Sequence, residues 1–286
     1  MVGEHDRQES EAQTRLATQA IQFARSLFNK LPSDLPTPEI GSMLHLEREY
    51  TKRGSTDTLV MTHRARAHEN LSRIFDTMID EEGGRLLAYP FSIYSLIRPS
   101  IEAAAVAMWL VKSSKKADRV LRALQMAYRD SSETLKFVEI IKGKNGAKSA
   151  RDAKEKTLER LKELQNTVGP LRQVELGNPP TYTQILTSVS PKPRGSATGY
   201  GISSPLVIWK ASSAFLHGSD ETVRALSDIR QIDDFEEGVA SFEITPNMQM
   251  LAVSIRAVVD LLSELDERYL FLATHDHRHR PVGGSK

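Results

Sequence analysis

The chain has 286 residues, of which 40% are hydrophobic and 26% charged, the composition of a globular protein with ample material for a core. Its 38 basic and 37 acidic residues leave a formal net charge of +1, which argues against a general nucleic-acid coat but allows a local basic groove. It contains no cysteine, which excludes disulfides and thiolate metal sites and suits a cytoplasmic location.

The first part of the chain predicts helices separated by polar or proline-rich connections. Residues 1–8 are polar and are expected to form a disordered tail. Apolar residues then recur every three or four positions over 9–31, and the prolines that follow end this helix. A short helix is expected over 39–51 and a longer one over 59–82, with Asp57 or Thr58 as its N-cap and Gly83-Gly84 as its end.

The segment from Leu86 to Lys112 is the most apolar stretch of the chain, and from Tyr94 onward it is apolar nearly all round a helix. This pattern predicts a buried helix around which the rest of the chain packs. Pro99 predicts either a kink or the first residue of a new helix. Because Arg98, Pro99 and Glu102 interrupt the apolar run, we expect no membrane-spanning helix.

The middle of the chain predicts a clean amphipathic helix over 116–142 and a highly charged helix over 147–168. Residues 147–202 are expected to form a peripheral arm and a proline- and glycine-rich loop, with a short helix at 181–188.

The last third begins with a helix that Ser204 and Pro205 start and Gly218 ends. A short helix should follow from Asp220 to Gln231, and the alternating residues of 233–245 leave room for one β-hairpin. Thr245-Pro246 should begin a long final helix, and 276–286 should be a disordered tail. We therefore predict an all-α, irregular bundle of seven to nine helices, with a single helical domain over 9–275.

The strongest candidate for chemistry lies on the helix that ends at Gly218. Lys210 and His217 are seven residues apart, so they share a helix face, and Ser213 lies between them. An imidazole of near-neutral pKa can transfer protons during RNA cleavage, and a lysine can stabilise the developing negative charge. The alternative is a structural histidine that caps its own helix.

A second candidate lies on one stripe of the central helix. Arg98 and Glu102 are four residues apart inside an apolar segment, and Tyr94 and Trp109 on the same stripe could form apolar walls. The alternative is a charge pair that fixes helix register. Our hypothesis is that this stripe faces the helix carrying Lys210, and that both sets of polar groups line one recess.

These two segments resemble a set of uncharacterised bacterial all-helical proteins with an Arg-Pro-x-x-Glu helix and a Ser-x-x-x-His-Gly helix. The matching residues here are Arg98, Pro99 and Glu102, with Ser213, His217 and Gly218. Such proteins are distantly similar to HEPN domains, and the resemblance implies a metal-independent ribonuclease site in a helical bundle that is often dimeric. This sequence departs from the HEPN pattern, because Lys210 stands where an arginine is expected and lysine cannot clamp phosphate in a bidentate manner.

Two weaker patterns occur near the C-terminus. Arg268 and His275 have the HEPN spacing, but this composition produces such pairs by chance. His275, His277 and His279 could in principle bind a metal, yet a solvated tail is the simpler interpretation, and we expect neither a metal site nor a cofactor.

Two functional hypotheses follow. The first is a HEPN-like ribonuclease or toxin-type effector acting on RNA, with His217 as general acid/base, Lys210 as phosphate stabiliser, Ser213 between them, and Arg98 with Glu102 in support. The second is a non-catalytic helical interaction or oligomerisation protein, which would bind a partner or a second copy of itself through its long C-terminal helix and its charged 147–168 helix.

Overall fold

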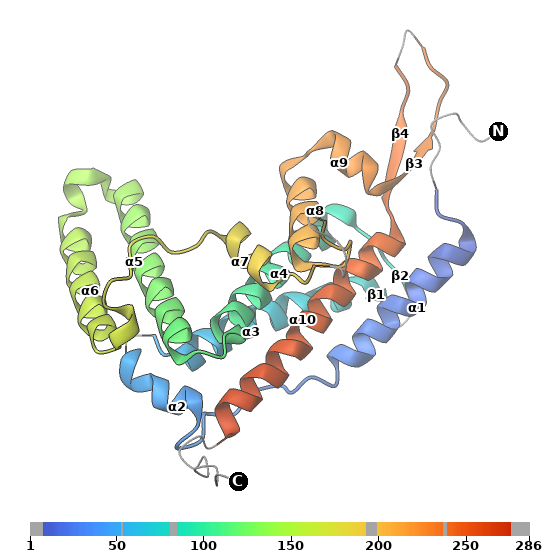
Figure 1. The fold of residues 1–286 in the computed structure, drawn as a ribbon. Coiled ribbons are helices and arrows are strands. Elements are labelled where there is room, and N and C mark those ends of the chain that lie inside the picture. The colour runs from blue at the N-terminus through green and yellow to red at the C-terminus, as the bar shows by residue number, and fades with distance from the viewer. Residues whose placement is uncertain (1–7, 53, 81–84, 193–198, 237–238, 276–286) are drawn as a thin grey trace, which may run out of the picture. The chain divides into compact units, whose positions relative to one another are not determined.

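A computed structural model describes residues 8–275, apart from residue 53 and residues 81–84, 193–198 and 237–238. These residues form ten α-helices and two two-stranded antiparallel sheets, so the all-α prediction is confirmed, with one helix and one hairpin more than expected (Figure 1). The predicted helix end at Gly83-Gly84 and the two predicted disordered tails lie outside the described residues, except for Gln8.

The chain divides into two compact units, each assembled from three separate segments. The first unit comprises Met1–Ser33, His63–Ala105 and Leu186–Glu264, and the second comprises Asp34–Thr62, Val106–Ile185 and Leu265–Lys286. Four helices contribute residues to both units: α3 (Thr56–Met78), α4 (Pro90–Lys112), α7 (Tyr182–Val189) and α10 (Met248–Thr274). The expected single domain over 9–275 therefore stays a prediction.

The first unit also contains α1 (Glu11–Phe28), α8 (Pro205–His217) and α9 (Asp220–Ala225). Its sheets are β1 (Ile79–Asp80) with β2 (Arg85–Leu86), and β3 (Ser227–Gln231) with β4 (Phe242–Pro246). Its core combines fully buried aliphatic and aromatic side chains from five helices: Ile21, Leu71, Ile74, Ile93, Ile97, Ile101, Phe215, Leu251, Ile255 and Val258.

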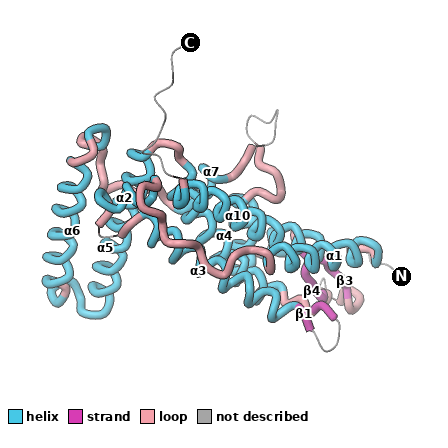
Figure 2. The backbone as a smooth tube through the Cα atoms, turned by 90° about the horizontal axis from the view of Figure 1, so that it is seen from below, coloured by secondary structure: helices cyan, strands magenta, loops and turns pink. Residues whose placement is uncertain are grey.

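The second unit contains α2 (Met43–Glu47), α5 (Lys116–Gly146) and α6 (Lys148–Asn166), with short 3-10 helices at Arg48–Tyr50 (η1) and Gly169–Leu171 (η2). Helices α5 and α6 lie side by side as a helical hairpin, which both views show (Figures 1 and 2). The two helices and the segment after α6 enclose a small core made of Val120, Leu124, Leu161, Val168, Leu171 and Leu176.

Helix α4 is buried as its sequence predicts. From Ile101 to Val111 its apolar side chains are at most 6% exposed, and the helix continues through Pro99 without a break. Next to that proline, the Ser100 hydroxyl donates a hydrogen bond of 2.8 Å to the carbonyl oxygen of Ala67 on α3. The fully buried Ser100 hydroxyl therefore has a hydrogen-bond partner, as buried polar groups generally do.

Several predicted boundaries are wrong. The helix expected from Asp220 to Gln231 ends at Ala225, because β3 follows and pairs with β4 from Ser227↔Pro246 to Gln231↔Phe242. Pro246 therefore ends a strand and does not begin α10, whose N-terminus is capped by the Asn247 side chain through the N–H of Met250 at 2.9 Å. Helix α3 begins at Thr56, ahead of the proposed Asp57 or Thr58 cap.

The start of α10 is also held by the N-terminal segment. Both carboxylate oxygens of Glu9 accept backbone hydrogen bonds of 2.8 Å, from Met248 and Gln249. The Glu9 N–H in turn donates to Asp228 of β3 at 2.7 Å. A carboxylate at a helix N-terminus satisfies free N–H groups and interacts favourably with the helix dipole.

Among the described helices, none is both long enough and apolar enough to cross a membrane.

Candidate functional site

Helix α8 is fixed at both ends by local sequence, which orients the candidate residues along it. The Ser204 hydroxyl accepts from the N–H of Val207, Pro205 occupies the first turn, and Ser190 accepts from the N–H of Leu206 at 2.9 Å. Gly218 ends the helix in the left-handed conformation, with φ of 64° and its N–H bonded to the Ala214 carbonyl. The roles of Ser204, Pro205 and Gly218 were predicted from the sequence and are confirmed, whereas the contact with Ser190 was not predicted.

The predicted stripe of α4 faces α8. The Arg98 Nε donates to the Ser213 hydroxyl oxygen at 3.0 Å, and the Trp209 indole N–H donates to the Glu102 carboxylate at 2.9 Å. Arg98 and Glu102 form an ion pair at 3.9 Å, and the guanidinium lies 5.4 Å from the centroid of the Trp209 ring. The four side chains form one polar cluster, which we call the α4–α8 cluster.

The α4–α8 cluster is partly exposed, and its polar side chains are hydrogen-bonded to one another. The side chains of Arg98 and Glu102 are 32% and 22% exposed. The Ser213 hydroxyl donates its proton to the Trp209 carbonyl at 2.7 Å while it accepts from Arg98. Because that proton is engaged by a carbonyl, and no side chain within the described residues accepts it, Ser213 lacks the arrangement of an activated nucleophile.

Aromatic rings close the apolar side of the cluster. Tyr94 is fully buried and its ring stacks on Phe215 of α8, with centroids 4.0 Å apart. Burial raises the pKa of the Tyr94 hydroxyl, so it stays neutral at physiological pH. Tyr94 therefore acts as an apolar wall between the two helices, as the sequence suggested.

The other predicted site residues make none of the hydrogen bonds of the cluster. Lys210 and His217 are exposed on α8, and the Lys210 ammonium lies 5.5 Å from the Trp209 ring centroid. The helix is already capped by Gly218, so His217 is not needed to end it. Trp109 belongs to the second unit, where the Arg122 guanidinium lies 5.2 Å from its ring and donates to its carbonyl.

Sequence reasoning missed Trp209 and Phe215, which contact Glu102 and Tyr94 of α4. The sequence did contain a signal for the Trp209 contact. A partly buried indole N–H needs a hydrogen-bond acceptor, and Glu102 is a carboxylate inside an apolar helix that could accept from it. The pairing itself joins residues 107 positions apart, which no local pattern encodes.

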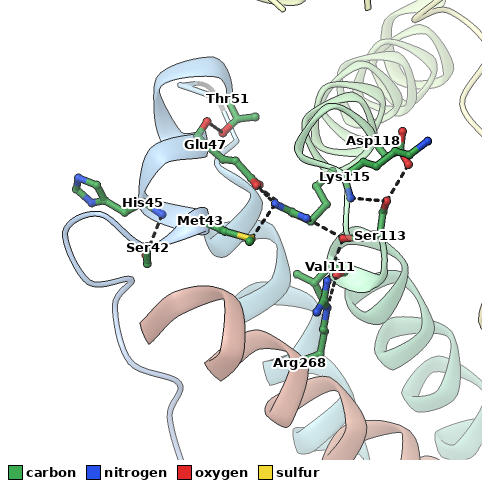
Figure 3. A network of polar contacts seen from close by, with 11 residues as sticks. Ser42, Met43, His45, Glu47, Thr51, Val111, Ser113, Lys115, Asp118 and Arg268 are labelled. Carbon is green, nitrogen blue, oxygen red and sulfur yellow. Dashed lines mark hydrogen bonds and ion pairs between the residues drawn. The ribbon is translucent and has the colours of Figure 1, made fainter. Parts of the chain in front are cut away.

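A second polar network occupies the second unit (Figure 3). Arg119 and Glu47 form an ion pair in which both side chains are only 1% exposed. Arg119 also donates to the Ser113 carbonyl at 2.7 Å, and Arg268 donates to the carbonyls of Val111 and Ser113 at 3.0 and 3.1 Å. Arg268, a weak sequence candidate, thus binds the free carbonyls at the end of α4.

Burial dominates the electrostatics of this ion pair. It raises the pKa of Glu47, although the hydrogen bond from Arg119 works in the opposite direction. One carboxylate oxygen of Glu47 is buried without a hydrogen-bond partner in the described part of the chain. The network holds α2 to α5.

No family model, curated protein or solved structure matches the chain. The resemblance to bacterial helical proteins and to HEPN domains therefore stays a prediction.

Of the tail histidines, His275 lies against Phe271 with ring centroids 4.6 Å apart, while His277 and His279 are outside the described residues. In the part of the chain that is described, no group of three or more acidic or histidine side chains is placed to hold a metal.

Proposed function

We propose that this chain is a non-catalytic helical interaction protein, and that the hairpin of α5 and α6 is its docking element. One observation carries the proposal. The second half of α5 exposes three large apolar side chains within five residues: Phe137 is 64% exposed, Ile140 82% and Ile141 63%. A contiguous group of exposed large apolar side chains is typical of a protein-binding surface.

The face of α5 that carries these residues is turned away from α6. Glu139 forms an ion pair with Arg151 of α6 at 3.1 Å, which marks the side of α5 that α6 covers. Phe137 and Ile141 are each two residues from Glu139, and two residues rotate a helix by about 200°. Phe137 and Ile141 thus lie on the side opposite Glu139, and Ile140 beside them is 82% exposed, so all three are available to another molecule.

The ribonuclease hypothesis receives less support from the geometry. Arg98 binds Ser213 and Glu102, and Trp209 binds Glu102, whereas Lys210 and His217 are exposed and Lys210 approaches the cluster only through the Trp209 ring. The hypothesis remains testable, because it requires RNA cleavage without added metal that is lost in His217→Ala. We expect no cleavage above background from either protein. Cleavage by the wild type that His217→Ala abolishes, with the fold retained, would overturn the non-catalytic proposal.

Docking itself is tested by placing a photo-crosslinking amino acid at position 140 in cells that express the chain. We expect a discrete adduct that disappears when Phe137 and Ile141 are both changed to serine. The matched control carries the same amino acid at Glu155, on the exposed surface of α6. Failure to form an adduct at position 140, or an equal yield of adducts at position 155, would contradict the proposal.

A further inference from the structure

The apolar face of α5 continues into a basic turn. Lys142, Lys144 and Lys148 follow Ile141, all three are exposed, and the sequence from 142 to 148 contains no acidic residue. We call Phe137, Ile140 and Ile141, together with these three lysines, the arm patch. It combines exposed apolar area with a local charge of +3 in a chain whose formal net charge is +1.

The β3–β4 hairpin carries a surface of the opposite charge. Near its tip, Ile232 is 63% exposed, Phe235 51% and Val239 73%. Asp233, Asp234 and Glu236 lie between them and are also exposed, and no basic residue occurs from 232 to 242. We call these six residues the hairpin patch.

The hairpin patch is presented by a well-formed scaffold. β3 and β4 pair over five residues each, and the Glu236 and Val239 backbones continue the pairing toward the tip. The rings of Phe235 and Phe242 pack edge to face with centroids 6.2 Å apart. Backbone hydrogen bonding from Ser241 lowers the pKa of Asp233, so this carboxylate is charged at neutral pH.

From this complementarity we infer that a second copy of this chain is the partner: the arm patch of one copy binds the hairpin patch of the next. Each patch offers three large apolar side chains and three charges of one sign, so contact would cover the apolar groups while opposing charges face each other. The inference rests on the proposed function of the α5–α6 hairpin and names its partner.

Such an interface is heterologous, because two different surfaces meet. A heterologous contact generates a ring if its rotation closes and an open chain of subunits if it does not. It also leaves one free patch of each kind on every incomplete assembly. A two-fold contact between arm patches alone would instead stop at a dimer and leave the hairpin without a role.

The experiment uses two charge-reversed variants of the full chain. The arm variant is Lys142→Glu/Lys144→Glu, and the hairpin variant is Asp234→Lys/Glu236→Lys, which leaves the Asp233 hydrogen bond intact. Mass is measured by light scattering and sedimentation over a range of concentrations. We expect wild type to grow beyond a monomer with concentration, less so at high salt, and each variant to associate at least about tenfold more weakly.

Mixing the two variants provides the decisive measurement. The arm variant keeps a functional hairpin patch and the hairpin variant keeps a functional arm patch, and the two reversed patches again carry opposite charges, so the mixture should regain the association that each variant alone has lost. Lys156→Glu/Lys162→Glu on the exposed face of α6 is the matched control, since it makes the same charge change as the arm variant outside the patch. This control should associate like wild type.

Four results would overturn the inference: a wild type that stays monomeric at every concentration, a hairpin variant that associates like wild type, a mixture of variants that stays monomeric, or an α6 control that loses association. A monomeric wild type that still gives a position-140 adduct with a different protein would overturn the self-association but leave the proposed function standing. Absence of both self-association and adduct would remove the proposed function as well.

Discussion

At the scale of single residues, the buried pair of Arg119 and Glu47 is the most consequential polar contact. Each side chain is 1% exposed, so removing one leaves the other charge buried without its partner. We expect Arg119→Met to lower the free energy of unfolding by about 3–5 kcal/mol. The double variant Glu47→Leu/Arg119→Met should recover most of that loss. Urea unfolding of the three proteins measures it, and a double variant as unstable as the single one would contradict the explanation.

Asp57 should make stability depend on pH in a predictable direction. Burial works to raise its pKa, but hydrogen bonds from Arg48 and Ser55 outweigh this effect and hold the pKa below its usual value. A lowered folded-state pKa means stabilisation that is present above the unfolded value and is lost as pH falls through the folded one. Asp57→Asn should therefore cost about 1–3 kcal/mol at neutral pH. The gap to wild type should close in strong acid.

The control for this prediction is Asp76→Asn. Asp76 pairs with Arg73 at 3.5 Å, but both side chains are more than half exposed, so the pair should contribute little at any pH. Thermal unfolding from neutral to strongly acidic pH follows both variants. A stability gap for Asp57→Asn that persists unchanged in acid would show that the carboxylate charge is not its source.

The candidate site shows what local sequence can and cannot predict about residues. An arginine and a glutamate four positions apart in an apolar helix marked one stripe of α4 as unusual, and our hypothesis was that this stripe faces α8. Which atoms meet could not be predicted. Glu102 takes its shortest hydrogen bond from Trp209, at 2.9 Å, and lies 3.9 Å from Arg98. Such choices depend on packing between distant segments.

At the scale of elements, locally encoded helix ends were predicted well and long-range pairing was not. Ser204, Pro205 and Gly218 delimit α8 because each acts on its own turn of backbone. The stretch that forms β3 was predicted to be part of a helix. It is extended because β4, which begins 15 residues beyond Ser227, supplies its backbone hydrogen bonds, and the local sequence does not reveal this partner.

Gly218 provides a test of helix termination. Its φ of 64° is unfavourable for any residue with a Cβ, although the surrounding space would admit one. We expect Gly218→Ala to destabilise the protein by about 1 kcal/mol, through the backbone alone. Gly169→Ala is the matched control, since that position is equally open but has no positive φ. Equal melting temperatures for the two variants would count against a role of Gly218 in ending α8.

At the scale of the whole molecule, the question is whether the two units unfold together. Helices α3, α4, α7 and α10 each supply residues to both units, so unfolding one unit would interrupt four helices whose remaining turns belong to the other. Helix formation is cooperative, and short remnants are unstable in water. We therefore expect one unfolding transition shared by both units.

The two tryptophans make this prediction directly measurable, because Trp209 lies in the first unit and Trp109 in the second. In Trp109→Phe the remaining fluorescence reports on the first unit, and in Trp209→Phe it reports on the second. Within each variant, the fluorescence transition in urea should coincide with loss of helical circular dichroism. Ile21→Ala and Leu161→Ala, one in each core, should then shift both reporters by equal amounts, since each removes a fully buried side chain from the same cooperative system. Reporters that respond only to the substitution in their own unit would mean that the units unfold independently despite the helices they share.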